Sequence, residues 1–391
     1  MTVPKPFTID TPQEKLDWIR DRVSAYRWFP EPADEEAAGG WAYGTSTPAL
    51  RELQDYWLTT YDWRTAEARL NAWPHFTADI DGLSIHFLHI QGEAGGQRPL
   101  LITHGWPGSV LEFWTIIEPL AFPSRHGGKK EDAFDLVLPS LPGYAWSGKP
   151  ASPIGQRSTA ALWDKLMRDV LGYDQYLAQG GDWGSLVTSW LGFDHGVAKK
   201  GGCKAIHLNM IGLRPTPASP HTDAETDWIA ATQASMQAEG SYLMQQATKP
   251  QTLALGLMDS PMGQAAWILE KFHRWSDLGG GSLFDAYSKD DLLTNIMIYL
   301  VNDAFATSVW YYNGLFREGG PGLPEGERCE TPTGFAVYPG ETVFSAPPRS
   351  WAERVYNITH WTEMDSGGHF AAMERPGLFV DNVRAWARQV A

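Results

Sequence analysis

The pentapeptide Gly180-Gly181-Asp182-Trp183-Gly184 lies between a strand-like run, residues 176–179, and a helix-like run, residues 185–191. A nucleophile elbow needs small residues around one polar residue at a strand-to-helix turn, because side chains at the outer glycines would collide with the neighbouring backbone. The pentapeptide fits this pattern and predicts that Asp182 is the nucleophile. Taken alone, it fits an ordinary turn with Asp182 as a helix cap better.

An aspartate at an elbow limits the chemistry that can follow. A serine that attacked a saturated carbon would become an inert ether, whereas a carboxylate becomes an ester whose carbonyl water can attack. The reference pKa of aspartate is about 3.9, so it needs no base to ionise it at neutral pH. A partner histidine is then free to activate water. The elbow therefore indicates alkyl transfer followed by hydrolysis.

The composition fits a soluble enzyme of small molecules. The chain has 391 residues, 43% of them hydrophobic, which is enough for one large α/β domain with insertions or for two domains. Its net charge of −15 argues against nucleic acid or an anionic membrane surface as a partner. Cys203 and Cys329 lie in no zinc-binding pattern, and we expect neither a metal nor a cofactor. Residues 1–10 lack the basic region and apolar run of a signal peptide, and no apolar run reaches the roughly 20 residues of a membrane span, so we expect a cytoplasmic protein.

The pattern of strands and helices divides the chain into parts. Residues 1–75 are helical in pattern and carry no catalytic cluster, so we expect a structural meander. Strands and helices alternate through residues 76–212, which predicts a parallel doubly wound sheet. Residues 213–330 are again helical, and the sheet resumes over residues 331–391. A helical insertion of this kind is expected to cap the carboxyl edge of the sheet, where such folds bind ligands.

Individual elements follow from hydrophobic spacing and turn residues. The first helix is expected to begin at Pro12, with Asp10 or Thr11 as its cap, and to end before Pro30. The other expected helices are one opened by Pro48 and those at 160–171, 185–193, 224–246, 261–275, 290–316 and 376–390. The expected strands are two joined at Asp81-Gly82 and those at 99–104, 135–139, 176–179, 205–210, 334–338 and 355–362.

Three further features accompany the elbow. The run His104–Ser109 follows a buried strand and holds glycines that let backbone amides face an oxyanion, which predicts a hole made by the amides of Trp106 and Trp183. His369 lies in a glycine-rich loop after the last strand, and Glu341 follows the strand before it. The order nucleophile, acid, histidine is typical of an α/β-hydrolase triad. Glu363 and Asp365 are closer to the histidine in sequence and are the alternative acids, although we expect Asp365 to cap its own loop.

Several stretches carry a resemblance to one enzyme family: Tyr61-Asp62-Trp63-Arg64 with Leu70-Asn71, Ile80–Leu83 with Ile85-His86-Phe87, His104–Ser109, Gly180–Ser185, Ala247–Pro250, Leu292–Asn295 and Gly367–Ala372. On these motifs the chain resembles the epoxide hydrolases of the microsomal type, in the α/β-hydrolase superfamily, over nearly its whole length. The resemblance implies an α/β-hydrolase fold: a mostly parallel sheet flanked by helices, an N-terminal helical meander and an all-helical cap inserted in the core.

The resemblance also implies a role for each site residue. Asp182 matches the family's nucleophile and His369 its general base. Glu341 matches the charge-relay acid, because it follows Tyr338-Pro339 where the family has an aromatic residue, proline and then an acid.

Two cap tyrosines of the family hold the epoxide oxygen, and Tyr242 and Tyr312 match them, with Tyr311 as the alternative to Tyr312. After the second tyrosine the family usually has a basic residue and a glutamate, where this chain has Asn313-Gly314.

The expected function is therefore hydrolysis of a small hydrophobic epoxide to a vicinal diol through an ester on Asp182, with water as the second reactant and no cofactor. A haloalkane dehalogenase and a non-catalytic hydrolase-fold protein that binds a small ligand are the alternatives. Detoxification, catabolism and secondary metabolism all stay open as the physiological role. The meander either covers its own subunit or supports a homodimer.

Overall fold

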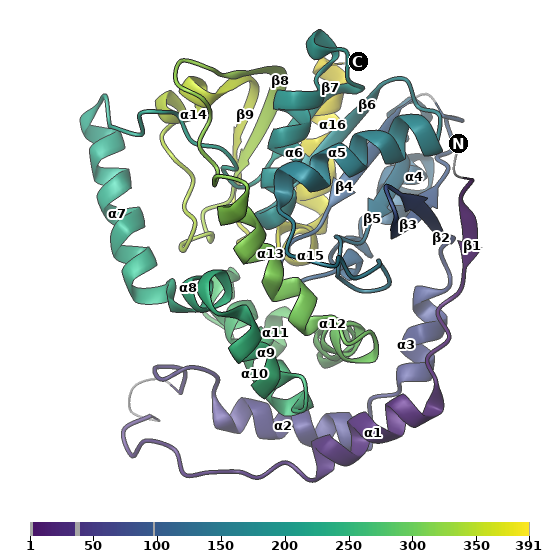
Figure 1. Ribbon diagram of the computed structural model, residues 1–391, viewed down its shortest axis with the longest axis vertical. Coiled ribbons are helices and arrows are strands. Elements are labelled where there is room, and N and C mark those ends of the chain that lie inside the picture. Colours follow the sequence, from purple (N-terminus) through teal and green to yellow (C-terminus); the bar gives the residue numbers. More distant parts are fainter. Residues whose placement is uncertain (1–2, 36–39, 97, 391) are drawn as a thin grey trace.

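A computed structural model describes residues 3–35, 40–96 and 98–390, and in this part of the chain one nine-stranded sheet organises the fold (Figure 1). Its strand order is β1-β2-β3-β5-β4-β6-β7-β8-β9. The strands are β1 (Lys5–Phe7), β2 (His75–Ile80), β3 (Leu83–Ile90), β4 (Pro99–Thr103), β5 (Asp135–Pro139), β6 (Tyr176–Gly180), β7 (Cys203–Leu208), β8 (Cys329–Val337) and β9 (Tyr356–Glu363). Pairing is antiparallel from β1 to β5 and parallel from β5 to β9. The predicted α/β fold with a mostly parallel sheet is confirmed.

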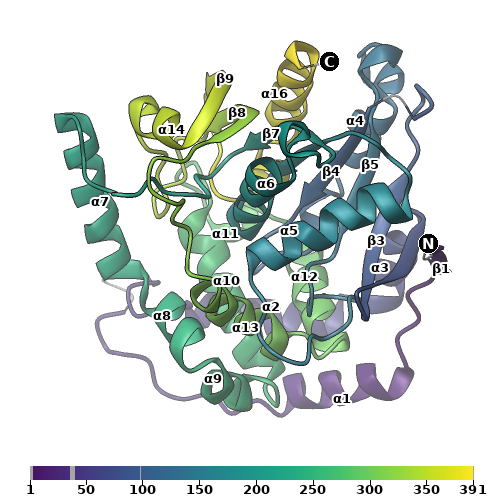
Figure 2. The same ribbon diagram turned by 45° about the horizontal axis from the view of Figure 1, so that its top comes forward.

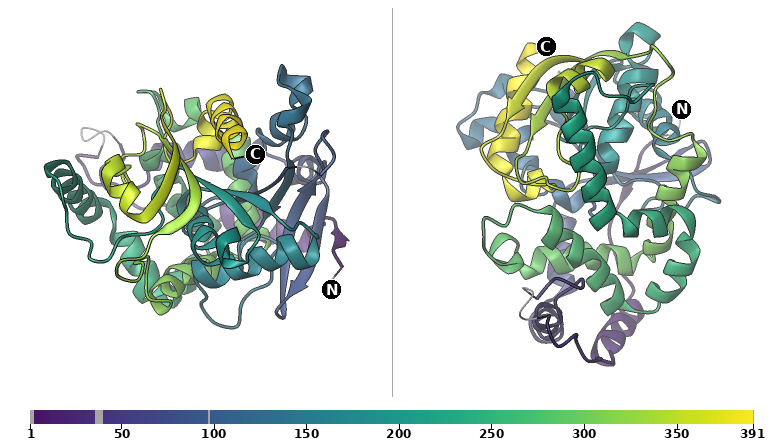
Figure 3. Two further views of the ribbon diagram at one scale, coloured as in Figure 1. Left: turned by 90° about the horizontal axis from the view of Figure 1, so that it is seen from above. Right: turned by 90° about the vertical axis from the view of Figure 1, so that its left-hand side faces the viewer.

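Helices cover both faces of this sheet, as a strand that is apolar on both sides requires. Leu101 of β4 packs into one apolar cluster with α5 (Gln156–Lys165) and α6 (Asp182–His195), whereas its neighbours in β4 pack into a second cluster with α4 (Ile117–Ala121) and α16 (Pro376–Gln389). Figure 3 shows the sheet between these two layers of helices. The ends of β6, β8 and β9 lead into the loops that carry the predicted triad.

A block of helices follows β7 and precedes β8 in the sequence, and it sits over one end of the sheet (Figure 2). Its members are α7 (Asp223–Glu239), α8 (Ser241–Thr248), α9 (Pro250–Leu257), α10 (Pro261–Trp275), α11 (Leu283–Ala286), α12 (Lys289–Val301) and α13 (Phe305–Arg317).

Two long helices expected in this block are each broken in two. The expected helix 224–246 is divided at Gly240, which leaves the helical conformation with φ −83° and ψ 1°. The expected helix 290–316 is bent by 86° between α12 and α13, where Asp303 has a φ of 48°. Among the described residues no single helix is long and apolar enough to cross a membrane. Only α12 and α13 together meet that criterion, and the bend lies between them.

The meander contains α1 (Gln13–Ser24), α2 (Thr47–Thr59) and α3 (Trp63–Leu70), and it packs beneath the cap helices (Figure 1). Ion pairs Arg22–Asp259 and Arg69–Asp291, each 2.7 Å long, join the two parts. The meander of this chain thus covers its own cap.

Details of the meander correct the sequence-based expectations. The helical pattern of residues 1–75 did not predict β1, which adds a short edge strand to β2. α1 begins one residue later than expected and ends at Ser24, with Pro12 as its N-cap residue. Neither expected cap acts on it: no side chain caps α1, and the Thr11 hydroxyl oxygen accepts instead from Trp63 Nε1, at 3.0 Å.

Candidate active site

Asp182 stands at a sharp turn between β6 and α6. Its φ is 47°, in the left-handed region that few residues other than glycine adopt. A Cβ at Gly180 would overlap the carbonyl group of Gly184, and a Cβ at Gly184 would overlap that of Thr103. The turn can therefore be this tight only with glycine at both positions, as predicted for an elbow. α6 begins at Asp182 itself, three residues before the expected start.

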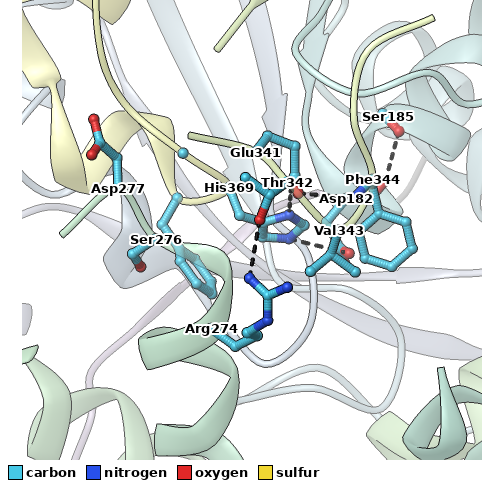
Figure 4. A network of polar contacts seen from close by, with 12 residues as sticks. Asp182, Ser185, Arg274, Ser276, Asp277, Glu341, Thr342, Val343, Phe344 and His369 are labelled. Atoms are coloured by element: carbon cyan, nitrogen blue, oxygen red, sulfur yellow. Dashed lines mark hydrogen bonds and ion pairs between the residues drawn. The ribbon is translucent and has the colours of Figure 1, made fainter. Parts of the chain in front are cut away.

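His369 lies between two carboxylates, those of Asp182 and Glu341 (Figure 4). Its Nε2 is 3.4 Å from Asp182 Oδ2, and its Nδ1 hydrogen-bonds to Glu341. The other carboxylate oxygen of Glu341 accepts a hydrogen bond from the Phe344 amide at 3.0 Å. The His369 amide donates to the Trp275 carbonyl at 2.9 Å, which ties the histidine loop to α10. Nucleophile, histidine and acid are thus adjacent although they are far apart in sequence.

The structure distinguishes between the candidate acids. Glu341 is buried and hydrogen-bonds to the imidazole, whereas Glu363 and Asp365 are exposed and form no hydrogen bond or ion pair with His369 within the part of the chain that the structure describes.

The two carboxylates set the charge of His369. Burial lowers the pKa of the imidazole, but the negative charges of Glu341 and Asp182 outweigh it and hold the pKa of His369 well above its usual value. The resting site therefore holds an imidazolium between two carboxylates. Neutralising Asp182 would remove one of the causes that raise this pKa.

One of the two predicted oxyanion donors contacts the nucleophile. The Trp106 amide donates to Asp182 Oδ1 at 2.7 Å. Trp183 follows in the first turn of α6, and among the described residues its amide makes no hydrogen bond to this carboxylate. Glycine at position 105 lets the loop after β4 pass close to Asp182, because a Cβ there would overlap the Asp182 side chain.

A cavity of about 130 Å3 opens on Asp182. Tyr242 of α8 and Tyr312 of α13 line it, whereas the Tyr311 hydroxyl donates to Thr159 Oγ1 at 2.8 Å. Burial raises the pKa of Tyr242 and of Tyr312 well above its usual value, so both phenols are neutral donors at ordinary pH. Most of the remaining lining is apolar: Trp183, Leu186, Met210, Ile211, Trp228, Met236, Leu243, Leu315, Pro321 and Phe344.

Asn313-Gly314, where the family usually has a basic residue and a glutamate, has a structural role in this chain. Asn313 Nδ2 donates to the Ala247 carbonyl at 2.7 Å and so joins α13 to α8, the two helices that carry the tyrosines. A Cβ at Gly314 would overlap the carbonyl group of Ile154. Asn313 therefore ties together the two helices that carry the phenols, and Gly314 lets α13 lie close to the backbone at Ile154.

Sequence analysis did not identify two ionisable groups close to the triad and the cap tyrosines. Glu112, in the 3-10 helix Val110–Phe113, accepts a hydrogen bond from the Gly105 amide at 3.4 Å. The one feature of the sequence that could have identified Glu112 is that it is an acid within an apolar run directly after the His104–Ser109 motif. Lys271 of α10 places its ammonium 4.3 Å from the ring centroid of Tyr242, and no motif marks it. Across residues 3–35, 40–96 and 98–390, no group of three or more His, Cys, Asp or Glu side chains could hold a metal ion.

Known proteins match almost the whole chain, and two known families match parts of it. Residues 4–113 match the family described as epoxide hydrolase N terminus, and residues 98–241 match the alpha/beta hydrolase fold. A protein of Stigmatella aurantiaca (strain DW4/3-1) that carries an epoxide hydrolase name is 42% identical over 98% of this chain and 85% of its own length. Epoxide hydrolase 1 of Sus scrofa is 33% identical, over 97% of this chain and 87% of that protein.

A solved structure agrees with these sequence matches. The epoxide hydrolase of Aspergillus niger superposes with a TM-score of 0.84 at 32% identity, over 99% of this chain and 97% of that one. The chain therefore belongs to the epoxide hydrolase family, whose members are hydrolases with the α/β-hydrolase fold.

Proposed function

We propose that this enzyme converts an epoxide to a vicinal diol through a covalent hydroxyalkyl ester on Asp182. The observation that carries the proposal is an aspartate, rather than a serine, at an elbow whose histidine lies 3.4 Å away. A carboxylate is the nucleophile that gives a hydrolysable intermediate after attack on a saturated carbon. The substrate we propose is a small hydrophobic epoxide, because the cavity beside Asp182 is lined mainly by apolar side chains.

In the first step an Asp182 oxygen attacks a ring carbon, and the bond from that carbon to the epoxide oxygen breaks. Tyr242 and Tyr312 hydrogen-bond this oxygen as its negative charge develops, and one of the phenols gives it a proton, which solvent then replaces. The ester leaves Asp182 uncharged, so the pKa of His369 falls as one of its two raising charges disappears. His369 then releases its Nε2 proton to solvent, which balances the proton that the phenol takes back from solvent.

In the second step neutral His369 takes a proton from water at Nε2, and the water oxygen bonds to the ester carbon of Asp182. Glu341 holds the imidazole in place and stabilises its positive charge. The Trp106 amide, already directed at Oδ1, stabilises the tetrahedral oxyanion, and we propose the Trp183 amide as its partner. The diol leaves with the remaining proton of the added hydroxyl, which restores the carboxylate.

Isotope labelling during a single turnover tests the covalent route. With enzyme in excess over epoxide in H2 18O, we expect one 18O atom in the peptide that contains Asp182 and none in the first diol released. Direct attack by water would place 18O in that diol and would contradict the proposal. A His369→Gln variant should gain the mass of the epoxide at Asp182 and hold it, because no base then activates water.

A comparison of products decides between epoxide hydrolysis and the dehalogenase alternative. Wild type and Asp182→Asn are incubated with a panel of aryl and alkyl epoxides and, separately, with bromoalkanes. We expect diol from the wild type alone and no halide from either. Halide without diol would assign dehalogenation instead, and ligand binding without either product would assign a binding protein.

A further inference from the structure

Asp182 forms part of the wall of a second cavity, which is much smaller than the first. This cavity has a volume of about 20 Å3. Of these two cavities, Tyr242 and Tyr312 line the larger one alone, whereas His369 and Glu112 line the smaller one alone. A water molecule needs a cavity of at least roughly 10 to 15 Å3 and two to four polar partners. The smaller cavity therefore has room for one water beside the nucleophile.

Among the described residues, two buried polar atoms of its lining make no hydrogen bond, although one of them, His369 Nε2, lies 3.4 Å from Asp182 Oδ2. His369 Nε2 and Gln179 Oε1 make no hydrogen bond within the residues that the structure describes. Gln179 lies at the end of β6, and its amide group is held in place because Nε2 donates to Asn209 Oδ1 at 2.9 Å. Buried polar atoms are nearly always satisfied by protein or by ordered water. These two are satisfied if one water bonds to both.

Glu112 supplies a third polar group, a hydrogen-bond donor that complements the acceptor Gln179 Oε1. Burial, and next the negative charge of Asp182, raise the pKa of Glu112 to about 8, although His369 and the Gly105 amide oppose this shift. The carboxyl is therefore protonated at neutral pH in the resting enzyme and can donate a hydrogen bond. A water can accept this bond and direct its own protons at Gln179 Oε1 and, once His369 is neutral, at His369 Nε2.

We propose that Glu112 and Gln179 position the hydrolytic water between His369 and Asp182, in a compartment separate from the substrate. The inference rests on the proposed function, because it concerns hydrolysis of the Asp182 ester. The water loses one proton to His369 Nε2 while its oxygen bonds to the ester carbon, and the diol departs as described above. Substrate thus reaches Asp182 from the larger cavity and water from the smaller one, so that a bound epoxide does not displace the water.

Single-turnover kinetics of three variants test this role. Glu112→Leu removes the hydrogen bond, Glu112→Gln keeps a neutral donor of similar shape, and Glu118→Gln is the matched control on an exposed side chain of α4. Formation and decay of the ester are followed by rapid quenching and mass spectrometry. In Glu112→Leu we expect ester hydrolysis to slow by roughly 10- to 100-fold while ester formation stays within about threefold. The ester should therefore accumulate, whereas Glu112→Gln should hydrolyse it within a few-fold of the wild-type rate.

Each other outcome has a defined meaning. Hydrolysis at the wild-type rate in Glu112→Leu, or equal slowing of both steps, would overturn the positioning role while leaving the covalent mechanism intact. Absence of the ester from wild type and from His369→Gln would instead refute the proposed function. If Glu112→Leu does not fold, Gln179→Leu tests the same site from β6 and should show the same selective loss of hydrolysis.

Discussion

The two halves of the active site differ in charge and in the elements that hold them. The half on the sheet consists of Asp182, His369 and Glu341, ionised groups at the ends of strands and in contact with one another. The half on the cap consists of Tyr242 and Tyr312, neutral phenols on two helices of the insertion.

This difference assigns the two halves to different steps of the reaction. Charged groups that change protonation suit nucleophilic attack and water activation, whereas neutral donors suit stabilisation of the epoxide oxygen. Removing groups from the sheet half should therefore block or trap the ester, and removing groups from the cap half should slow its formation. The following predictions test this division, from the largest expected effect to the smallest.

Asp182→Asn should lower diol formation most, on the order of 10⁴-fold or more, because an amide is a poor nucleophile and no ester can form. Diol release from a turned-over epoxide measures this loss. Asp365→Asn is the matched control, since that carboxylate is exposed. Mass spectrometry of the purified variant shows whether deamidation has restored the aspartate. Undiminished turnover by an Asp182→Asn preparation that contains no restored aspartate would remove Asp182 from the mechanism.

Glu341→Gln should lower turnover on the order of 10³-fold, because the imidazole loses the carboxylate that orients it and stabilises its charge. The loss should fall on hydrolysis, so that the ester accumulates in a single turnover. Glu363→Gln and Asp365→Asn, the rival acids, should keep the wild-type rate. If one of these variants lost activity while Glu341→Gln kept it, the triad would be assigned to the wrong acid.

The double variant Tyr242→Phe/Tyr312→Phe should slow ester formation on the order of 10²-fold, because the epoxide oxygen loses both donors. Hydrolysis of the ester that does form should remain within a few-fold of wild type. Tyr311→Phe is the control, since its hydroxyl bonds to Thr159 and does not line the cavity. A loss of hydrolysis rather than of ester formation would contradict the division between the two halves.

The sheet half was the easier one to predict from sequence, because its signals are local. The elbow requires glycines at fixed positions around Asp182, and short apolar runs mark the strands that carry the loops of the triad. The acid was harder to assign, because Glu363 and Asp365 are nearer to His369 in sequence. Only the folded chain shows that Glu341 contacts the imidazole.

The cap half depends on packing that periodicity does not record. Asn302 and Asp303 interrupt the apolar pattern only briefly, and so a single helix was expected where the chain bends by 86°. Adjacent tyrosines on one helix point about 100° apart, and only the bond from Tyr311 to Thr159 shows which of them faces the cavity. Glu112 was missed for a similar reason, since its position behind Asp182 arises from tertiary contacts.

Glu112→Gln should change how stability depends on pH. The unfolded pKa is about 4.5 and the folded pKa about 8, so unfolding releases a proton between these values. The contribution is fully present below pH 4.5 and is lost as pH rises towards 8, by at most about 1.4 kcal/mol per pH unit. The variant lacks this loss, so its free energy of unfolding should rise relative to wild type across the window and level off above it. Urea unfolding from pH 5 to 9 measures the difference, with Glu118→Gln as control, and parallel curves for wild type and Glu112→Gln would show that Glu112 is not protonated in the fold.

The smallest expected effect concerns Lys271, which belongs to the cap half although it is charged. Its ammonium, buried and paired with Glu270, lies 4.3 Å from the Tyr242 ring centroid, where a cation favours the electron-rich ring of a phenol that is giving up its proton. Lys271→Met keeps the apolar stem and removes the charge, and ester formation should slow by about 2- to 10-fold with hydrolysis unchanged. In a Tyr242→Phe background the same substitution should have no further effect on ester formation, because the phenol on which it acts is absent. An equal loss in both backgrounds would mean that Lys271 acts on packing of the cap rather than on Tyr242.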